Sequence, residues 1–293
     1  MKNKYLIVLL SVSLFFVSSF VSDKKELPKL GIVGGLAQDQ LVYSAGFRAN
    51  GESVKRVLSP SLTDQEFSDK LKEIRAAKCK LVSCNLFFPA TLKIAGPEVV
   101  EKRVLAYADS VLSRAGQAGV KYIVLGSGGS RNIPAGYDIE KAKADFVNLG
   151  KKLGGIAKKY QVTIVLENLE TTETTFITSL KAAAEIVRAV NHPNFRLNAD
   201  IFHMMREGES PEEIVAAGNL VGFSEIAEKE KRSLPGVMGD DFRPYLRALK
   251  KIGYKGYIFM EGSIKNPEVE IPQAFKYLSR QVAEVYEGVG GVE

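Results

Sequence analysis

Short runs of β-branched and aliphatic residues alternate with longer amphipathic stretches from Lys29 to the C-terminus. This alternation predicts repeated βα units and a parallel sheet. The predicted strands cover residues 30–33, 53–57, 81–85, 122–126, 163–167, 196–200, 221–226 and 257–261. Eight such strands suffice to close a barrel, so the sequence predicts an α/β fold, a (β/α)8 TIM barrel formed by one domain over residues 27–288.

Between the strands, amphipathic periodicity predicts helices at 63–76, 97–118, 139–160, 180–190, 242–252 and 271–287. Gly119 and Gly253 directly follow two of them, which is typical of helix C-termini. The strand at 53–57 is unusually polar, because Lys55 and Arg56 lie within it. A doubly wound open sheet is the competing architecture, since glycines occur at positions 31, 34 and 35. Their spacing differs from the G-x-G-x-x-G fingerprint of that fold.

The residues before Asp23 have the layout of a secretory leader. Lys2 and Lys4 precede an apolar run at 6–21, which is followed by Ser22 and a charged segment. This run is shorter than the roughly 20 residues of a membrane-spanning helix. We therefore expect a signal peptide over residues 1–22 and no stable membrane insertion after its cleavage. The mature chain is expected to be exported, and periplasmic if the source is Gram-negative. The glycine-rich end at 289–293 is expected to be disordered.

Charge and cysteine content exclude two classes of feature. The net charge is +6 without a dense basic stripe, so no nucleic-acid partner is predicted. Export permits disulfides, but Cys79 and Cys84 lie at the entrance and at the end of one predicted strand. Five extended residues span about 16 Å, whereas the Cα atoms of a disulfide lie within roughly 7 Å of each other. Two free, buried thiols are predicted.

Four predicted strands have an acidic residue at or next to their last position: Glu167, Asp200, Glu225 and Glu261. The active site of a βα barrel is built from the C-terminal ends of its strands. Because side chains alternate across a strand, all four acids are predicted to point inward at one height. Grouped carboxylates repel and raise one another's pKa, and a divalent cation relieves this repulsion. Oxygen ligands favour Mg²⁺ or Mn²⁺. The alternative is that each acid caps a helix or pairs with its own basic neighbour.

Two further residues lie near these strand ends. Asn85 ends its strand with the inward parity, and we expect it to contact substrate; Phe87 and Phe88 follow it as a sugar-stacking wall or as a packed loop. Arg131 follows a glycine-rich loop that starts at Gly126, and it is expected to pair with an acid, with a substrate contact as the alternative.

At these residues the chain resembles the sugar isomerase and epimerase family of xylose-isomerase-like barrels, including tagatose 3-epimerase-like enzymes. The matching segments are Val165-Leu166-Glu167-Asn168, Asp200-Ile201-Phe202-His203, Ile226-Ala227-Glu228 up to Arg232 with Pro235-Gly236, and Met260-Glu261-Gly262. The resemblance implies that Glu167 and Glu261 are metal ligands and also the acid/base pair. It implies that Asp200 is a third ligand of one divalent ion, Mn²⁺ or Mg²⁺, and that His203 and Arg232 contact substrate oxygens.

One position departs from the family pattern. The family usually has His-x-His before Ile-Ala-Glu, and its second histidine is a metal ligand. Here Phe223, Ser224 and Glu225 occupy these positions. Glu225 is therefore expected as a fourth ligand that adds negative charge and changes the preferred metal.

The resemblance implies an exported isomerase or epimerase for a small sugar or keto-sugar. Its carboxylates would move a proton next to the sugar carbonyl through an enediolate. A keto-glycoside lyase using the same carboxylates and a non-catalytic sugar-binding barrel are the alternatives, and homo-oligomer formation is left open. DNA-repair endonucleases share this barrel, but two histidines cannot build their multi-zinc centre.

Overall fold

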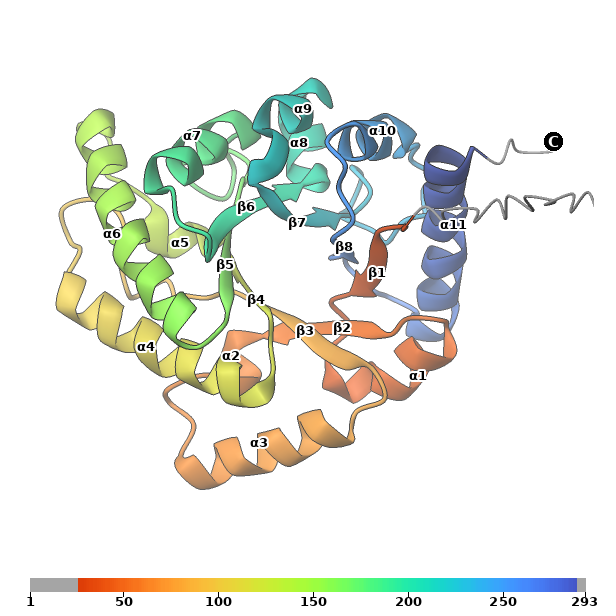
Figure 1. The fold of residues 1–293 in the computed structure, drawn as a ribbon, viewed down its shortest axis with the longest axis horizontal. Helices are drawn as coiled ribbons and strands as arrows, with labels where there is room; N and C mark the ends of the chain where they lie inside the picture. Colours follow the sequence, from red (N-terminus) through yellow and green to blue (C-terminus); the bar gives the residue numbers. More distant parts are fainter. Residues whose placement is uncertain (1–25, 289–293) are drawn as a thin grey trace, which may run out of the picture.

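A closed barrel of eight parallel strands forms the centre of the computed structural model, which describes residues 26–288 (Figure 1). The strands pair in chain order, and β8 pairs with β1 to close the barrel. They are β1 Lys29–Ile32, β2 Ala49–Ser53, β3 Lys80–Asn85, β4 Tyr122–Leu125, β5 Thr163–Glu167, β6 Phe195–Asp200, β7 Val221–Ile226 and β8 Tyr257–Met260. The prediction of a (β/α)8 barrel is confirmed. The leader at 1–22 and the tail at 289–293 lie outside the described residues.

Helices surround the barrel and connect consecutive strands (Figure 1). The longer ones are α3 Asp64–Ala76, α4 Glu101–Ala118, α6 Ile139–Lys159, α7 Leu180–Val190, α10 Arg243–Lys251 and α11 Pro267–Glu287. The shorter ones are α1 Asp39–Ser44, α2 Val54–Val57, α5 Gly128–Arg131, α8 Ile201–Glu207, α9 Glu212–Ala217 and the 3₁₀ turns η1 Leu36–Gln38 and η2 Gly218–Leu220. In the described part of the chain, no helix combines the length and apolar character that crossing a membrane requires.

Local signals in the sequence account for several helix ends. The α3 helix begins with a capping box, in which Thr63 Oγ1 accepts from the Glu66 N–H and Glu66 Oε2 accepts from the Thr63 N–H. The α4 helix ends at Gly119, which has a left-handed φ of 70°. The α11 helix starts four residues earlier than predicted, because Pro267 is tolerated in a first helical turn.

Aromatic and branched side chains fill the interior of the barrel below its C-terminal end. This interior cluster consists of Ala49, Val82, Val124, Val165, Phe223 and Phe259, with Val33, Tyr122 and Tyr257 packed against it. The rings of Phe223 and Phe259 lie 5.1 Å apart between their centroids. A Cβ atom on Gly31 would lie 2.3 Å from the Phe259 ring, so glycine is needed where the ring crosses β1. The inward parity predicted for β5, β7 and β8 is confirmed.

The prediction for the second strand was wrong in its position. The strand is Ala49–Ser53, and Val54–Val57 forms α2 instead of a strand. Asn50 is buried because its amide donates to the Gly35 carbonyl and accepts from the Gly34 N–H. Glu52 is buried because it accepts from the N–H groups of Leu36 and Ser53. The loop after β1 therefore supplies hydrogen-bond partners for two polar side chains of β2. These polar residues hide the strand from a prediction based on hydrophobicity.

Both cysteines are free and buried, as predicted. Cys79 directly precedes β3 and Cys84 lies within it. Burial raises the pKa of the Cys79 thiol to about 11, and burial also raises the pKa of the Cys84 thiol.

Candidate active site

The four predicted acids converge at the C-terminal end of the barrel. Glu167, Asp200 and Glu225 are buried at the C-terminal ends of β5, β6 and β7, and Glu261 directly follows β8. One carboxylate oxygen from each lies within 4.8 Å of the others. Strand register produces this arrangement, because Asp200 pairs with Glu225 and because each acid continues the inward face of its strand. The prediction that these acids meet is confirmed.

Two asparagines hold Glu225 in this cluster. Asn85 Nδ2 donates to Glu225 Oε1 at 2.9 Å and to Glu261 Oε1 at 2.5 Å. Asn198 Nδ2 donates to Glu225 Oε2 at 2.5 Å. Asn85 was expected to contact substrate, and here it bridges two of the acids. Sequence reasoning missed Asn198, although it lies two residues before Asp200 and therefore shares its inward face.

Arg232 is the guanidinium that contacts this carboxylate cluster. It donates to Glu261 Oε2, lies 3.3 Å from Glu173 Oε1, and stacks 4.8 Å from the Phe202 ring centroid. Burial lowers the pKa of Arg232, but the negative charges of the cluster, Glu261 first, outweigh burial and raise the pKa above its ordinary value. One guanidinium cannot neutralise four carboxylates, so the cluster keeps an excess of negative charge.

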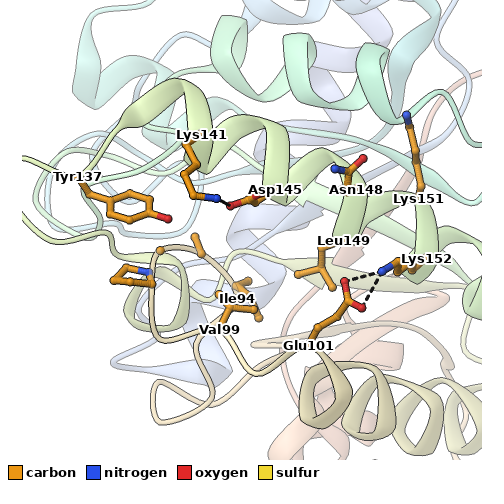
Figure 2. Close-up of a pocket in the computed structure, with 13 residues that line it drawn as sticks. Ile94, Val99, Glu101, Tyr137, Lys141, Asp145, Asn148, Leu149, Lys151 and Lys152 are labelled. Carbon is orange, nitrogen blue, oxygen red and sulfur yellow. Dashed lines mark hydrogen bonds and ion pairs between the residues drawn. The ribbon is translucent and has the colours of Figure 1, made fainter.

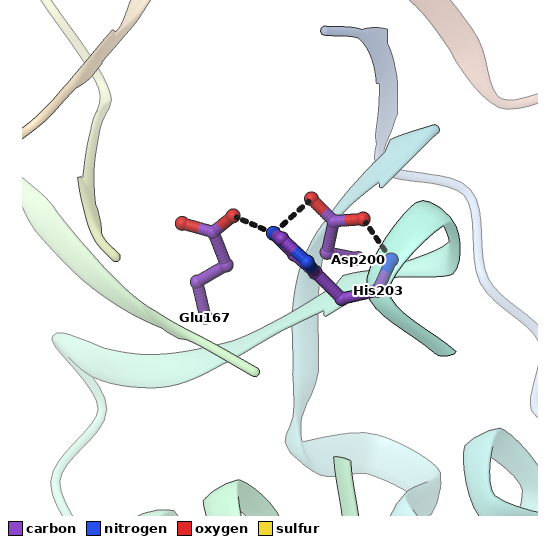
Figure 3. Close-up of side chains that lie close together, drawn as sticks. All are labelled: Glu167, Asp200 and His203. Carbon is purple, nitrogen blue, oxygen red and sulfur yellow. Dashed lines mark hydrogen bonds and ion pairs between the residues drawn. The ribbon is translucent and has the colours of Figure 1, made fainter. Parts of the chain in front are cut away.

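His203 lies against two of the acids. Asp200 caps α8, and its Oδ1 accepts from the His203 N–H at 3.1 Å. Figure 3 shows the ring directed between the acids, with His203 Nε2 3.5 Å from Glu167 Oε1 and 3.8 Å from Asp200 Oδ2. The D-x-x-H spacing noted in the sequence is therefore one turn of a capped helix. That turn brings the imidazole back over the cluster.

Burial and mutual repulsion raise the pKa values of two acids of the cluster, Glu167 and Glu225. Burial raises the pKa of Glu167 well above its ordinary value, and the charges of Glu261 and Asp200 raise it further. Burial likewise raises the pKa of Glu225, with contributions from Glu261, Glu167 and Asp200. Both shifts show that the protein alone does not compensate the charge that it gathers here.

The donor set fits a divalent cation. Oxygens bound to one octahedral Mg²⁺ at about 2.1 Å are at most about 4.2 Å apart, so shifts of less than about 1 Å would bring the four carboxylates around one ion. Asn85 Oδ1, Asn198 Oδ1 and both ring nitrogens of His203 are buried without a hydrogen-bond partner among residues 26–288. Glu167, Asp200 and His203 form a second, overlapping group with metal-ligand spacing. The all-oxygen group is the better match for a hard cation.

Arg131 stabilises the end of β5 rather than an acid. Its buried guanidinium donates to the main-chain carbonyls of Glu167 at 2.8 Å and of Ile177 at 3.1 Å. The expected pairing with a carboxylate side chain was therefore wrong. Burial lowers the pKa of Arg131 to about 10, which leaves the group charged at neutral pH.

Glu228 organises the loop that carries Arg232, and sequence reasoning did not single it out. This buried carboxylate accepts from the N–H groups of Gly236, Met238, Gly239 and Asp240 and from the Ser233 hydroxyl. Its own N–H donates to the Ser233 carbonyl at 2.8 Å. The signal in the sequence was an acid followed by Gly236 and Gly239, residues that suit closely spaced N–H donors.

A groove lies on the molecule away from the carboxylate cluster. It has a volume of about 800 Å³ and lies between α6 and the loop that precedes α4. Figure 2 shows the side chains that line it. Its charged side chains are paired with one another, Lys152 with Glu101 and Lys141 with Asp145. None of the predicted site residues lines it.

Comparisons with known proteins agree with this geometry. A family model described as xylose isomerase-like TIM barrel matches residues 40–281. An L-ribulose 3-epimerase of Methylomonas sp. (strain DH-1) is 30% identical over 120 residues, which are 41% of this chain and 42% of that protein. The chain spans about half the length of the curated relatives that it matches.

Two solved structures show the same fold. A D-psicose 3-epimerase crystallised in the presence of D-fructose has a TM-score of 0.74 and 18% identity, and the match covers 89% of this chain and 99% of that one. The IOLI protein, crystallised with a zinc atom, has a TM-score of 0.68 and 20% identity, and the match covers 90% of this chain and 100% of that one.

Proposed function

The chain belongs to the xylose isomerase-like TIM barrel family, and on this basis we propose that it is a sugar isomerase or epimerase. The reaction would be proton transfer at the carbon next to the carbonyl of a sugar or keto-sugar. The observation that carries the proposal is the convergence of Glu167, Asp200, Glu225 and Glu261 within 4.8 Å at the barrel mouth. The epimerase relatives support the class of reaction.

A divalent cation is part of the proposal, with Mn²⁺ or Mg²⁺ held by the four carboxylates. When bound, it would supply positive charge next to the sugar oxygens on which negative charge develops. The IOLI protein, which has the same fold and binds a zinc atom, supports a metal as part of the proposal. Glu225, fixed by the amides of Asn85 and Asn198, favours a harder ion than zinc, because it supplies oxygen where the family usually has a histidine nitrogen.

The acid and base roles follow from the positions of two strands. Glu167 comes from β5 and Glu261 follows β8, with β6 and β7 between them, so the two carboxylates reach a bound sugar from different sides. Glu167 would accept the proton from carbon on one face, and Glu261 would return a proton on the other, which inverts the configuration. Asn85 and Arg232 both donate to Glu261 and would keep its carboxylate in place.

Two other residues are proposed to contact the sugar. Arg232 projects its guanidinium over Glu261, where it would donate to a sugar oxygen beside the reacting carbon. Neither ring nitrogen of His203 makes a hydrogen bond in the described part of the chain, and Nε2 faces the acids, so the ring would be able to bond a sugar hydroxyl held over the cluster. We also propose that the protein acts outside the cytoplasm, on the strength of the leader sequence at 1–22. Mass spectrometry of the mature N-terminus in secreted or periplasmic protein tests this location.

Metal analysis and proton exchange test the proposed activity. Purified protein is expected to hold about one Mn²⁺ or Mg²⁺ per chain and to exchange a carbon-bound hydrogen of a ketose with heavy water. Glu167→Gln and Glu261→Gln should each abolish exchange without lowering the unfolding temperature. Glu230→Gln, an exposed acid of the loop after β7, is the matched control. Exchange at the wild-type rate in either active-site variant would contradict the acid/base assignment, and sugar binding without any exchange would indicate a binding protein.

A further inference from the structure

A hollow distinct from the groove of Figure 2 lies beside the C-terminal ends of β2, β3 and β4. This rim pocket has a volume of about 380 Å³ and is lined by the loops after β2, β3 and β4 together with Tyr107 of α4. Its walls include Lys55, Ser61, Leu86, Phe88 and Ser127. The volume falls within the range of roughly 300–1,000 Å³ that is usual for small-molecule sites.

Chain connectivity places the rim pocket next to the reacting centre. Leu86 directly follows Asn85, whose amide donates to Glu225 and Glu261. Ser127 directly follows Gly126, where an added Cβ would lie 2.1 Å from Glu167 Oε2. Consecutive Cα atoms are about 3.8 Å apart, so the pocket wall begins roughly one residue away from the carboxylates. The rim pocket therefore lies on the side toward which a molecule bound over the cluster would extend past the ends of β3 and β4.

Hydrogen bonds between the loops hold this pocket open. The Phe88 N–H donates to Ser127 Oγ at 3.0 Å, and Lys93 Nζ donates to the Gly129 carbonyl at 2.9 Å. Leu86 and Ser127 both have left-handed φ values, 59° and 46°, which is costly for residues other than glycine. Leu86 is consequently turned outward and is 61% exposed. A strained, cross-linked pocket with an exposed apolar wall has the properties of a preformed binding site.

The chemistry of the walls matches a sugar ring. Leu86 and Tyr107 provide apolar and aromatic surface for the C–H face of a ring, and the buried Phe88 packs behind Tyr107. The exposed Ser61 and the largely buried Ser127 provide hydroxyls for the edge of the ring. Among the described residues that line the pocket there is no carboxylate, and Lys55 is the one cation. Phosphate sites usually gather arginine or several free N–H donors. Here the N–H groups of Ser130 and Arg131 already donate to the Ser127 carbonyl.

We propose that the rim pocket binds a second sugar ring, so that the substrate is a ketose carrying a glycosidic substituent rather than a free monosaccharide. This inference rests on the proposed function for the position of the reacting sugar. The pocket walls at Leu86 and Tyr107 would then select the substrate by its second ring.

A matched set of substrates tests the inference. D-fructose is compared with its glucosyl derivatives maltulose, leucrose and isomaltulose, which carry the second ring at three different oxygens and leave the carbons around the carbonyl free. Deuterium exchange should proceed with a kcat/KM at least about tenfold higher for one of the disaccharides than for fructose. Ser61→Trp, which fills the pocket, should lower this ratio about tenfold. Ser110→Trp, on an exposed face of α4 outside the pocket, should leave the ratio unchanged.

Calorimetric binding of the same sugars separates this inference from the proposed function. Tighter binding of a disaccharide that is weakened by Ser61→Trp supports the second-ring site even in a protein that exchanges no hydrogen, a result that would refute the isomerase proposal alone. Equal affinity and equal exchange for fructose and all three disaccharides, insensitive to Ser61→Trp, would overturn the rim-pocket inference and leave the isomerase proposal standing.

Discussion

Replacing Glu228 with glutamine is expected to destabilise the protein and to displace Arg232. Glu228 Oε1 accepts from Gly236, Gly239 and Asp240, and Oε2 accepts from Met238 and the Ser233 hydroxyl. Glutamine keeps one acceptor oxygen and places an NH₂ group against the other donors. The serine hydroxyl can rotate to accept, but the Met238 N–H cannot.

The size of the effect follows from these contacts. Losing one N–H bond to a charged acceptor and weakening the other three costs about 3 kcal/mol, because each such bond contributes about 1.5–3 kcal/mol. For a domain of this size, that loss lowers the unfolding temperature by about 6–12 °C. The same loop also carries Arg232 and fixes its position. The Arg232 carbonyl accepts from the Ser263 N–H at 2.7 Å. We therefore expect kcat/KM for ketose exchange to fall about tenfold, the loss of one transition-state contact.

A double-mutant cycle with Arg232→Ala tests whether Glu228 acts through Arg232. In the Arg232→Ala background, Glu228→Gln should still lower the unfolding temperature but should change kcat/KM no further. Glu230→Gln, an exposed acid in the same loop, serves as the control in both assays. An unchanged unfolding temperature for Glu228→Gln would refute the argument from its contacts. Additive losses of kcat/KM in the double variant would refute the coupling to Arg232.

Two further predictions concern the charge of the cluster. Glu225→His should raise the affinity for Zn²⁺ relative to Mn²⁺ by at least about tenfold, because an imidazole nitrogen suits zinc. Isothermal titration measures both affinities, and an unchanged ratio would show that Glu225 is not a ligand. The pKa values of Glu167 and Glu225 are raised in the folded protein, so the metal-free fold binds more protons than the unfolded chain between the ordinary pKa of 4.5 and the folded value. Stability of the metal-free protein should therefore increase as pH falls from neutral towards 4.5, the ordinary pKa, and added Mn²⁺ should stabilise more at the higher pH. Thermal unfolding in chelator across this pH range measures the effect, and a metal-free protein that loses stability on mild acidification would contradict it.

The strands β5, β6 and β7 were predictable because their signals are local. Each has apolar residues at every second position and an acid at or next to its last residue, so the direction of Glu167 or Glu225 follows from the two-residue period of a strand. By contrast, β2 was misplaced because Asn50 and Glu52 are buried on hydrogen bonds to residues 34–36, which only the folded loop supplies. Short α8 went unnoticed because seven residues are too few for a helical period to show.

The amino-acid order by itself determined the eight βα units, the inward face of each acid-ending strand, and hence the meeting of the acids at one edge. These are consequences of periodicity within one strand and of parallel strands ending together. Only tertiary structure decided which groups balance those acids. Asn85 donates to Glu225, although the two residues are 140 positions apart in the sequence. Arg131 donates to main-chain carbonyls and not to a carboxylate. Such partners depend on strand register and on loop conformation, which local sequence patterns do not encode.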